Sequence, residues 1–365
     1  MQWYTVNNIS SIDTPALLLY QQRVQQNIQA AVAMVQQPGR LRPHVKTNKI
    51  PQVCQLMMQQ GILHFKCATI AEAEMLAMVA APDVLLAYQP VGPKVNRLLQ
   101  LVQQYPHTKF SAVTDSLVAA QIISQVFDAA GHQLALYIDV DTGMHRTGIA
   151  PAAAATLATQ LQQLPAIVLA GLHVYDGHIT ETDVSTRQQQ SDEGFFAITQ
   201  LANTIESITG RPCAVVAGGS PTFNTHINRT VQCSPGTFVF WDWGYQQKYP
   251  DLPFEWAALV ACRVISIPTA HTITTDLGHK SVAAENPLPR VHFLNAPGAV
   301  PIGQSEEHLV LQVASSSHYQ PGDVLYAVPV HICPTVALYE KAVVIQNNTA
   351  FTSWRVTARD KAIHI

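Results

Sequence analysis

The segments KFSAVTD (residues 109–115), LALYIDVD (134–141) and IVLAGLHVY (167–175) decide the fold predicted for this chain. Each is a short run of apolar and β-branched residues that ends in polar residues, which is typical of a buried strand. The segments between them, 116–130 and 151–164, are longer and mix apolar with polar residues as amphipathic helices do. Because helices alternate with strands, the sequence predicts a parallel sheet.

The same pattern extends outward from these segments, from Leu41 to Asp242. Eight strands with helical crossovers fit a closed (β/α)8 TIM barrel, which we assign to residues 12–255. A doubly wound open sheet is the alternative. The predicted strands are residues 42–46, 64–69, 84–89, 109–115, 134–141, 167–175, 214–218 and 231–240.

The sequence changes character after about Pro253, where short strand-like runs are interrupted by Pro, Gly and Asn and helical spacing is absent. This pattern predicts a C-terminal antiparallel β domain, to which we assign residues 1–11 and 256–365. The expected fold class is therefore α/β, a barrel with an appended β domain. The strand-like runs are residues 256–267, 271–276, 308–313, 324–331, 341–345 and 354–357.

The composition excludes several classes of protein. Only 12% of the 365 residues are charged and the net charge is −3, so the basic surface of a nucleic-acid-binding protein is absent. The most apolar window, residues 75–92, contains Asp83 and two prolines, so no membrane span is predicted. The six cysteines are scattered without a CxxC pair, which indicates reduced thiols. We expect a cytoplasmic protein without a nucleic-acid or membrane partner.

Lys46 is the first candidate for chemistry. Barrel enzymes carry their reactive residues at the carboxyl ends of the strands, and Lys46 ends the first predicted strand. A lysine inside a barrel mouth is desolvated, and nearby cations such as Arg42 lower its pKa further, which makes the amine nucleophilic. Lys46 therefore suits a Schiff base with a carbonyl group. A solvated lysine at a strand end is the alternative interpretation.

A phosphate site is predicted after the seventh and eighth strands, because loops at these positions commonly bind phosphate in barrels. The residues there combine glycines with hydroxyl groups, although an ordinary Gly-Pro turn is the alternative. A lysine that forms a Schiff base, together with a phosphate cradle, points to pyridoxal 5′-phosphate (PLP) as the cofactor. The candidate residues are Gly218, Gly219, Ser220, Thr222, Gly236 and Thr237.

A candidate metal site lies in the predicted β domain. His331 and Cys333 are two residues apart on a strand-like run, so both side chains are expected on one face. An imidazole and a thiolate make a nitrogen–sulfur pair that suits Zn²⁺. A histidine beside a buried structural cysteine is the alternative.

In combination, seven motifs resemble the D-threonine aldolase / D-serine dehydratase family, which belongs to the alanine-racemase-like, fold type III PLP enzymes. The resemblance covers nearly the whole chain, and one departure is Asn48, where the family often has histidine. The motifs are DTPA (13–16), RPHVKTNK (42–49), DTGMHRTG (141–148), YDGH (175–178), GGSPT (218–222), SEEH (305–308) and PVHICPT (329–335).

The resemblance implies a PLP-binding barrel, a C-terminal β domain and a homodimer. It implies that Lys46 holds PLP, that Arg146 contacts the phenolic oxygen of the cofactor ring, and that Tyr175 borders the ring. Ser220 and Thr222 would lie near the phosphate. His331 and Cys333 would hold a divalent metal, Zn²⁺ or Mn²⁺, beside the hydroxyl group of the substrate.

The implied function is a lyase that acts on small D-3-hydroxy amino acids. Removal of the α-proton by Lys46 and loss of hydroxide would make the protein a D-serine dehydratase, which yields a 2-oxo acid and ammonia. Deprotonation of the β-hydroxyl would make it a D-threonine aldolase, which yields glycine and an aldehyde. Cysteine at the second ligand position is more typical of the dehydratase branch, so we favour D-serine dehydratase. An amino-acid racemase and a PLP-binding protein without turnover are further alternatives.

Overall fold

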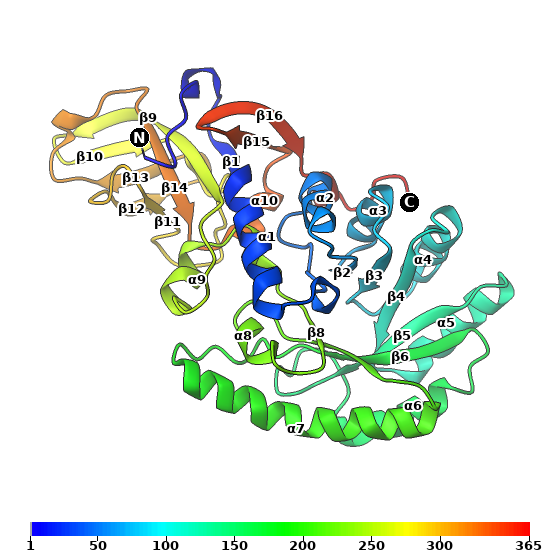
Figure 1. The fold of residues 1–365 in the computed structure, drawn as a ribbon. Helices are drawn as coiled ribbons and strands as arrows, with labels where there is room; N and C mark the ends of the chain where they lie inside the picture. The colour runs from blue at the N-terminus through cyan, green and yellow to red at the C-terminus, as the bar shows by residue number, and fades with distance from the viewer. Residues whose placement is uncertain (1) are drawn as a thin grey trace. The chain divides into compact units, whose positions relative to one another are not determined.

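The computed structural model describes residues 2–365, which form two compact units (Figure 1). One unit comprises the chain up to Ala30 with residues 47–53 and 237–359, and we call it the β unit. The other comprises residues 31–46, 54–236 and 360–365, and we call it the barrel unit.

Seven parallel strands form the sheet of the barrel unit, in the order β2-β3-β4-β5-β6-β7-β8. Each overlaps a predicted strand, so the prediction of a parallel α/β sheet is confirmed. The prediction of a long eighth strand over residues 231–240 is wrong, because β8 has two residues and a 3-10 helix follows it. The strands are β2 (His64–Cys67), β3 (Asp83–Leu86), β4 (Lys109–Thr114), β5 (Leu134–Val140), β6 (Ile167–Val174), β7 (Ala214–Ala217) and β8 (Gln232–Cys233).

The first predicted strand closes this sheet into a barrel. Leu41 bridges β8 and His44 bridges β2, both in parallel. The N–H of Arg42 donates to a carbonyl of β8 at 2.8 Å, and the N–H of Val45 donates to a carbonyl of β2 at 2.9 Å. Pro43 has no N–H to donate, which keeps this segment from forming a regular ladder. Because this segment pairs with β8 on one side and with β2 on the other, it joins the two edges of the seven-stranded sheet, and the open sheet is excluded.

Helices follow strands β2 to β6 in turn, as the sequence predicts. Three of them begin at capping side chains: Thr69, Ser116 and Asp183 each accept a backbone N–H of the first turn. The interior of the barrel is filled by residues from several strands, among them Leu85 and Tyr137. The helices of the chain are α1 (Gln21–Val35), α2 (Pro51–Gln59), α3 (Ile70–Met78), α4 (Pro93–Gln104), α5 (Leu117–Ala129), α6 (Pro151–Leu161), α7 (Val184–Thr209), α8 (Phe223–His226), α9 (Trp243–Lys248) and α10 (Ile332–Ala337).

The β unit is built on one mainly antiparallel sheet, in the order β12-β13-β10-β9-β1-β15-β16, with β14 and β11 joined to it through β9. The predicted C-terminal antiparallel domain is confirmed, but the sequence analysis missed β11 and β12. β1 lies within the residues 12–255 assigned to the barrel, yet it pairs with β9 and β15 in this sheet. The strands are β1 (Ala16–Tyr20), β9 (Ala258–Thr269), β10 (Thr272–Thr275), β11 (Val291–Phe293), β12 (Val300–Gln304), β13 (Leu309–Gln312), β14 (Val324–Pro329), β15 (Lys341–Gln346) and β16 (Thr349–Arg355).

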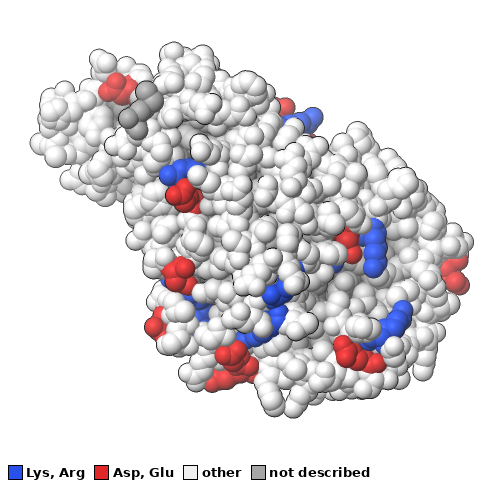
Figure 2. Space-filling view, in the orientation of Figure 1, with Lys and Arg blue, Asp and Glu red and all other residues white. Residues whose placement is uncertain are grey.

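Charged side chains are sparse on the face shown in Figure 2, and acidic and basic residues are interspersed rather than gathered by sign. No helix within residues 2–365 has the length and apolar character needed to cross a membrane.

Candidate active site

A pocket of about 560 Å³ opens at the carboxyl ends of the barrel strands, and Lys46 and Arg146 both line it. Its other lining residues come from residues 42–46, which we call the closing segment, and from the carboxyl ends of β2 to β5 and the loops after them. They include His44, Asp115 and Asp139. The volume lies within the range of roughly 300–1,000 Å³ that is usual for small-molecule sites. The end of the barrel at which the sequence predicts reactive side chains therefore contains a pocket large enough for a small molecule.

Lys46 is exposed at this mouth, whereas the residue before it, Val45, is fully buried. The backbone N–H of Lys46 donates to Nδ1 of His44 at 3.2 Å, which fixes the turn that carries the amine. The sequence analysis expected Lys46 to be desolvated, but its side chain is exposed in this structure.

Arg146 is held by a loop that folds back onto its own strand. The carboxylate of Asp141 accepts two backbone N–H groups of the loop, at 2.9 and 3.0 Å, and these bonds outweigh burial and lower its pKa to about 2. Gly148 has φ +102°, and a Cβ there would lie 2.7 Å from the nitrogen of Asp141, so only glycine fits. The loop places the guanidinium of Arg146 4.9 Å from the ring centroid of Tyr175.

Tyr175 lies at the centre of a group of cations. The amines of Lys46 and Lys66 each lie 5.9 Å from its ring centroid, in addition to the guanidinium of Arg146. A Cβ on Gly219 would come within 3.0 Å of this ring, so the tyrosine packs directly on the predicted phosphate loop. The structure thus brings together Lys46, Arg146 and Tyr175, as the sequence predicts.

The sequence analysis missed a buried chain of three residues beneath the mouth. Lys66 on β2 is 3% exposed, and its amine lies 3.4 Å from Nε2 of His173 on β6. Nδ1 of the same histidine lies 2.7 Å from a carboxylate oxygen of Asp139 on β5. Burial and the charge of Lys46 lower the pKa of Lys66 to about 7. A lysine between Phe65 and Cys67, in a segment that reads as a buried strand, was the signal that could have revealed this chain.

The predicted phosphate residues lie in two loops, one after β7 and one after β8. The hydroxyl of Ser220 accepts the backbone N–H of Gly236 at 3.1 Å, which links the two loops. Gly218 has φ +76°, and a Cβ there would lie 2.7 Å from the ring of His226. A bare glycine backbone beside hydroxyl groups, at the place where barrels bind phosphate, fits the phosphate of PLP.

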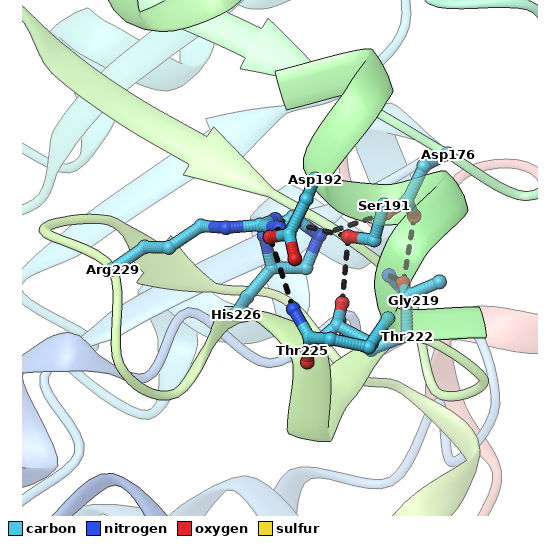
Figure 3. Close-up of polar contacts among 9 residues, drawn as sticks. Asp176, Ser191, Asp192, Gly219, Thr222, Thr225, His226 and Arg229 are labelled. Atoms are coloured by element: carbon cyan, nitrogen blue, oxygen red, sulfur yellow. Dashed lines mark hydrogen bonds and ion pairs between the residues drawn. The ribbon is translucent and has the colours of Figure 1, made fainter. Parts of the chain in front are cut away.

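Thr222 is already engaged in holding this loop (Figure 3). Its hydroxyl donates to Asp176 at 2.7 Å and accepts the N–H of Gly219 at 3.2 Å. Thr222 therefore shapes the loop through Asp176, and its predicted role at the phosphate stays a prediction.

The same aspartate anchors a buried network that extends to α7 (Figure 3). Asp176 lies 2.8 Å from Nε2 of His226, and Nδ1 of that histidine lies 2.8 Å from a guanidinium nitrogen of Arg229. Arg229 in turn pairs with Asp192. Because a guanidinium can only donate, Nδ1 accepts, so His226 carries its proton on Nε2 and donates it to Asp176.

We expect Asp176→Asn to lower the free energy of unfolding by about 1–3 kcal/mol, because the new amide places a donor against the N–H of His226. In the double variant with Arg229→Met, the histidine is free to move its proton to Nδ1 and accept from the amide. The two substitutions should therefore cost less together than the sum of the single variants. Urea unfolding followed by tryptophan fluorescence measures all three, and strictly additive losses would contradict the assigned proton position.

The predicted metal pair lies in the β unit, where the expected strand face is wrong. β14 ends at Pro329, His331 caps the short helix α10, and Cys333 lies in its first turn. Nδ1 of His331 contacts the carboxylate of Glu285, and the two predicted ligands interact with each other. Sγ of Cys333 lies 3.1 Å from the hydroxyl of Thr47 and 3.4 Å from that of Thr237.

The donor atoms of His331 and Cys333 are of a kind that binds metal ions, but two donors are too few for a complete site. Imidazole and thiolate suit Zn²⁺, and a carboxylate on the other ring nitrogen is the usual partner of a metal-binding histidine. Among residues 2–365, however, no group of three or more His, Cys, Asp or Glu side chains is placed to hold an ion. Thr237, predicted at the phosphate, contacts Cys333 in this unit.

Comparison with known proteins agrees with this architecture. The chain matches the family model "Alanine racemase, N-terminal domain" over residues 20–242 and "Putative serine dehydratase domain" over residues 257–345. It is 27% identical to D-threonine aldolase of Arthrobacter sp over 361 residues, 96% of this chain and 94% of that protein. It is 28% identical to D-threo-3-hydroxyaspartate dehydratase of Delftia sp. (strain HT23) over 243 residues, 65% of this chain and 63% of the relative.

Solved structures show the same fold over nearly the whole chain. D-threonine aldolase from Filomicrobium marinum superposes with a TM-score of 0.88 at 26% identity, over 95% of each chain. Alanine racemase of Clostridium difficile 630 superposes with a TM-score of 0.73 at 14% identity, which shows the fold alone. The chain therefore belongs to the alanine-racemase-like family, within the group of PLP-dependent lyases that D-threonine aldolases and D-3-hydroxyaspartate dehydratases represent.

Proposed function

We propose that this protein is a PLP- and metal-dependent lyase that acts on small D-3-hydroxy amino acids, with D-serine dehydration as its reaction. The observation that carries the proposal is the pocket lined by Lys46 and Arg146 at the barrel mouth. Relatives named as D-threonine aldolase and D-threo-3-hydroxyaspartate dehydratase support a β-hydroxylated D-amino acid as the substrate class.

The residues of the mouth fit PLP. Lys46 would hold the cofactor covalently, and the glycine backbone at Gly218 and Gly219 would receive its phosphate. The chemistry that PLP supplies when bound is an electron sink for the bonds at the α-carbon of an amino acid. Arg146 keeps positive charge beside the pocket, which favours the carboxylate of an amino acid.

The same residues could carry out dehydration or retro-aldol cleavage. The two reactions differ in which substrate atom loses a proton. If Nζ of Lys46 accepts the α-proton, the β-hydroxyl leaves and a 2-oxo acid with ammonia results. If the β-hydroxyl loses its proton, the bond between the α- and β-carbons breaks and glycine with an aldehyde results. We favour dehydration because the second proposed metal ligand, Cys333, is a cysteine, which resembles the dehydratase branch of the family more than the aldolase branch. Retro-aldol cleavage is the second candidate, since D-threonine aldolase of Arthrobacter sp aligns with 96% of the chain.

The decisive assay incubates the purified protein with PLP and Zn²⁺ or Mn²⁺, and then with D-serine or D-threonine. We expect pyruvate from D-serine and 2-oxobutyrate from D-threonine. Glycine with acetaldehyde from D-threonine would establish the aldolase instead. D-threo-3-hydroxyaspartate extends the assay to an acidic side chain, and L-serine is the control for stereochemistry. Interconversion of enantiomers without loss of substrate would mean a racemase, and an inert protein that binds PLP would contradict the lyase.

Metal dependence is tested in the same assay. We expect a chelator such as EDTA to lower turnover at least about tenfold, with recovery on addition of Zn²⁺ or Mn²⁺. Cys333→Ala should abolish the recovery while the absorbance of bound PLP persists. Unchanged turnover in the chelator would remove the metal from the proposal.

We further propose that the enzyme works as a cytoplasmic homodimer, and light scattering in solution tests the dimer.

A further inference from the structure

We propose that Lys66 is a second proton-exchanging residue of this active site, which takes up and returns the protons that the amine of Lys46 releases and regains. The catalytic part of this inference rests on the proposed function, whereas its acid–base part concerns the protein without cofactor. The inference stands on the buried chain of Lys66, His173 and Asp139.

The geometry of this chain follows the arrangement that activates a nucleophile in many enzymes, in which a carboxylate orients an imidazole and the imidazole faces the reactive group. Burial and the charge of Lys66 lower the pKa of His173. Burial alone would raise the pKa of Asp139, but the hydrogen bonds from His173 and Thr147 outweigh it and lower that pKa. The histidine is therefore neutral with its proton on Nδ1, directed at the ionised Asp139. Its Nε2 lone pair faces the amine of Lys66 at 3.4 Å, so this amine has an acceptor when it is charged.

The position of Lys66 makes proton exchange at the mouth possible. Its amine and that of Lys46 are equally distant, at 5.9 Å, from the ring centroid of Tyr175. The positive charge of Lys46 disfavours the protonated form of Lys66, so the proton affinity of the buried amine responds to the charge at position 46. The charged and titratable groups around Lys66 are Lys46 and Arg42 on the closing segment, Asp139 on β5, and His173 and Asp176 on β6 and its loop.

The proposed step balances within these residues. An N–H bond of the Lys46 ammonium breaks and leaves its electron pair on that nitrogen, while the lone pair of Lys66 forms a new N–H bond. The charged Lys66 then donates to Nε2 of His173, and the negative charge of Asp139 offsets the added charge. The reverse transfer restores Lys46. Neither an oxidant nor a further reactant is required.

Titration of the protein without cofactor provides the first test. In protein labelled with ε-13C lysine, the NMR signal that disappears in Lys66→Arg belongs to Lys66. We expect its midpoint near pH 7, far below the ordinary value of about 10.4. Lys46→Met should raise this midpoint by removing a positive charge, and Asp139→Asn should lower it by removing a negative one. A midpoint above about pH 9, or one that does not respond to Lys46→Met, overturns the proposal.

The second test uses the enzyme loaded with PLP. We expect Lys66→Met and Lys66→Arg each to lower kcat by about 10²-fold or more and to abolish the inflection that Lys66 gives the pH profile, with PLP still bound by its absorbance. Lys109→Met, at an exposed lysine on the opposite end of β4, is the control and should match the parent protein. If Lys66→Arg keeps the parent pH profile, fixed charge suffices and proton exchange is refuted.

The two tests separate failure of this inference from failure of the proposed function. If no D-3-hydroxy amino acid turns over, the proposed function fails, and the titration of the protein without cofactor still tests the role of Lys66. If a variant at position 66 does not fold, the Lys66 signal is identified in the parent protein as the lysine signal whose midpoint rises in Lys46→Met and falls in Asp139→Asn.

Discussion

Replacement of Lys46 by alanine is expected to lower turnover by on the order of 10⁴-fold or more and to abolish the absorbance of covalently bound PLP. Lys46 is the amine that lines the mouth pocket and is exposed to an incoming carbonyl group. Absorbance spectra before and after addition of PLP measure the loss directly, and the lyase assay measures turnover.

Two comparisons make this result specific. Lys49→Ala, which removes a lysine of the same motif, should keep the spectrum of the parent protein. Borohydride reduction followed by peptide mass mapping should place the cofactor on Lys46 alone. An unchanged spectrum in Lys46→Ala would exclude Lys46 as the cofactor lysine, and an adduct on Lys66 would show that the buried lysine carries the cofactor.

Arg42 is expected to carry the largest single effect on stability. Its side chain is 1% exposed, and its guanidinium donates to Gln232 of β8 and to Asp83 of β3, each at 2.6 Å. It therefore holds the closing segment to strands on either side. We expect Arg42→Met to lower the free energy of unfolding by about 3–5 kcal/mol, because Asp83 is left as a largely buried carboxylate without its cation. Urea unfolding measures the loss.

The acid dependence of stability gives this prediction a second readout. Burial alone would raise the pKa of Asp83, but His64 and Arg42 outweigh it and hold the pKa at about 2. A lowered pKa stabilises the folded protein above the unfolded value near 4, and this contribution is lost as pH falls from about 4 to about 2. In Arg42→Met, the loss of folding stability between about pH 4 and about pH 2 should be smaller than in the parent protein. Arg211→Met, at an exposed position, should stay within about 0.5 kcal/mol of the parent protein, and an equal effect of both variants would contradict the role of Arg42.

Much of the fold could be predicted because the signals are local. A buried strand needs a short apolar run and a surface helix needs one apolar face, and both patterns are visible within a few residues. The failures came from segments whose structure depends on distant partners. β1 joins a sheet formed mainly by residues after 257, and β8 stops after two residues where the chain turns into a 3-10 helix.

The candidate site shows the same division. The motif residues Lys46, Arg146 and Tyr175 gather at one end of the barrel because parallel strands place their carboxyl ends together. The prediction that His331 and Cys333 share one face of a strand was wrong, because the chain enters α10 after β14. The two side chains contact each other across a helical turn instead. Spacing alone could not distinguish these two backbones.

The sequence by itself determined the order of strands and helices and the identity of the residues at the barrel mouth, since both follow from short-range patterns. Only the tertiary structure decided which lysine is exposed and which is buried, because desolvation depends on what packs around an amine. Lys66 acquires its altered pKa from β5, β6 and the closing segment, which no spacing along the chain encodes.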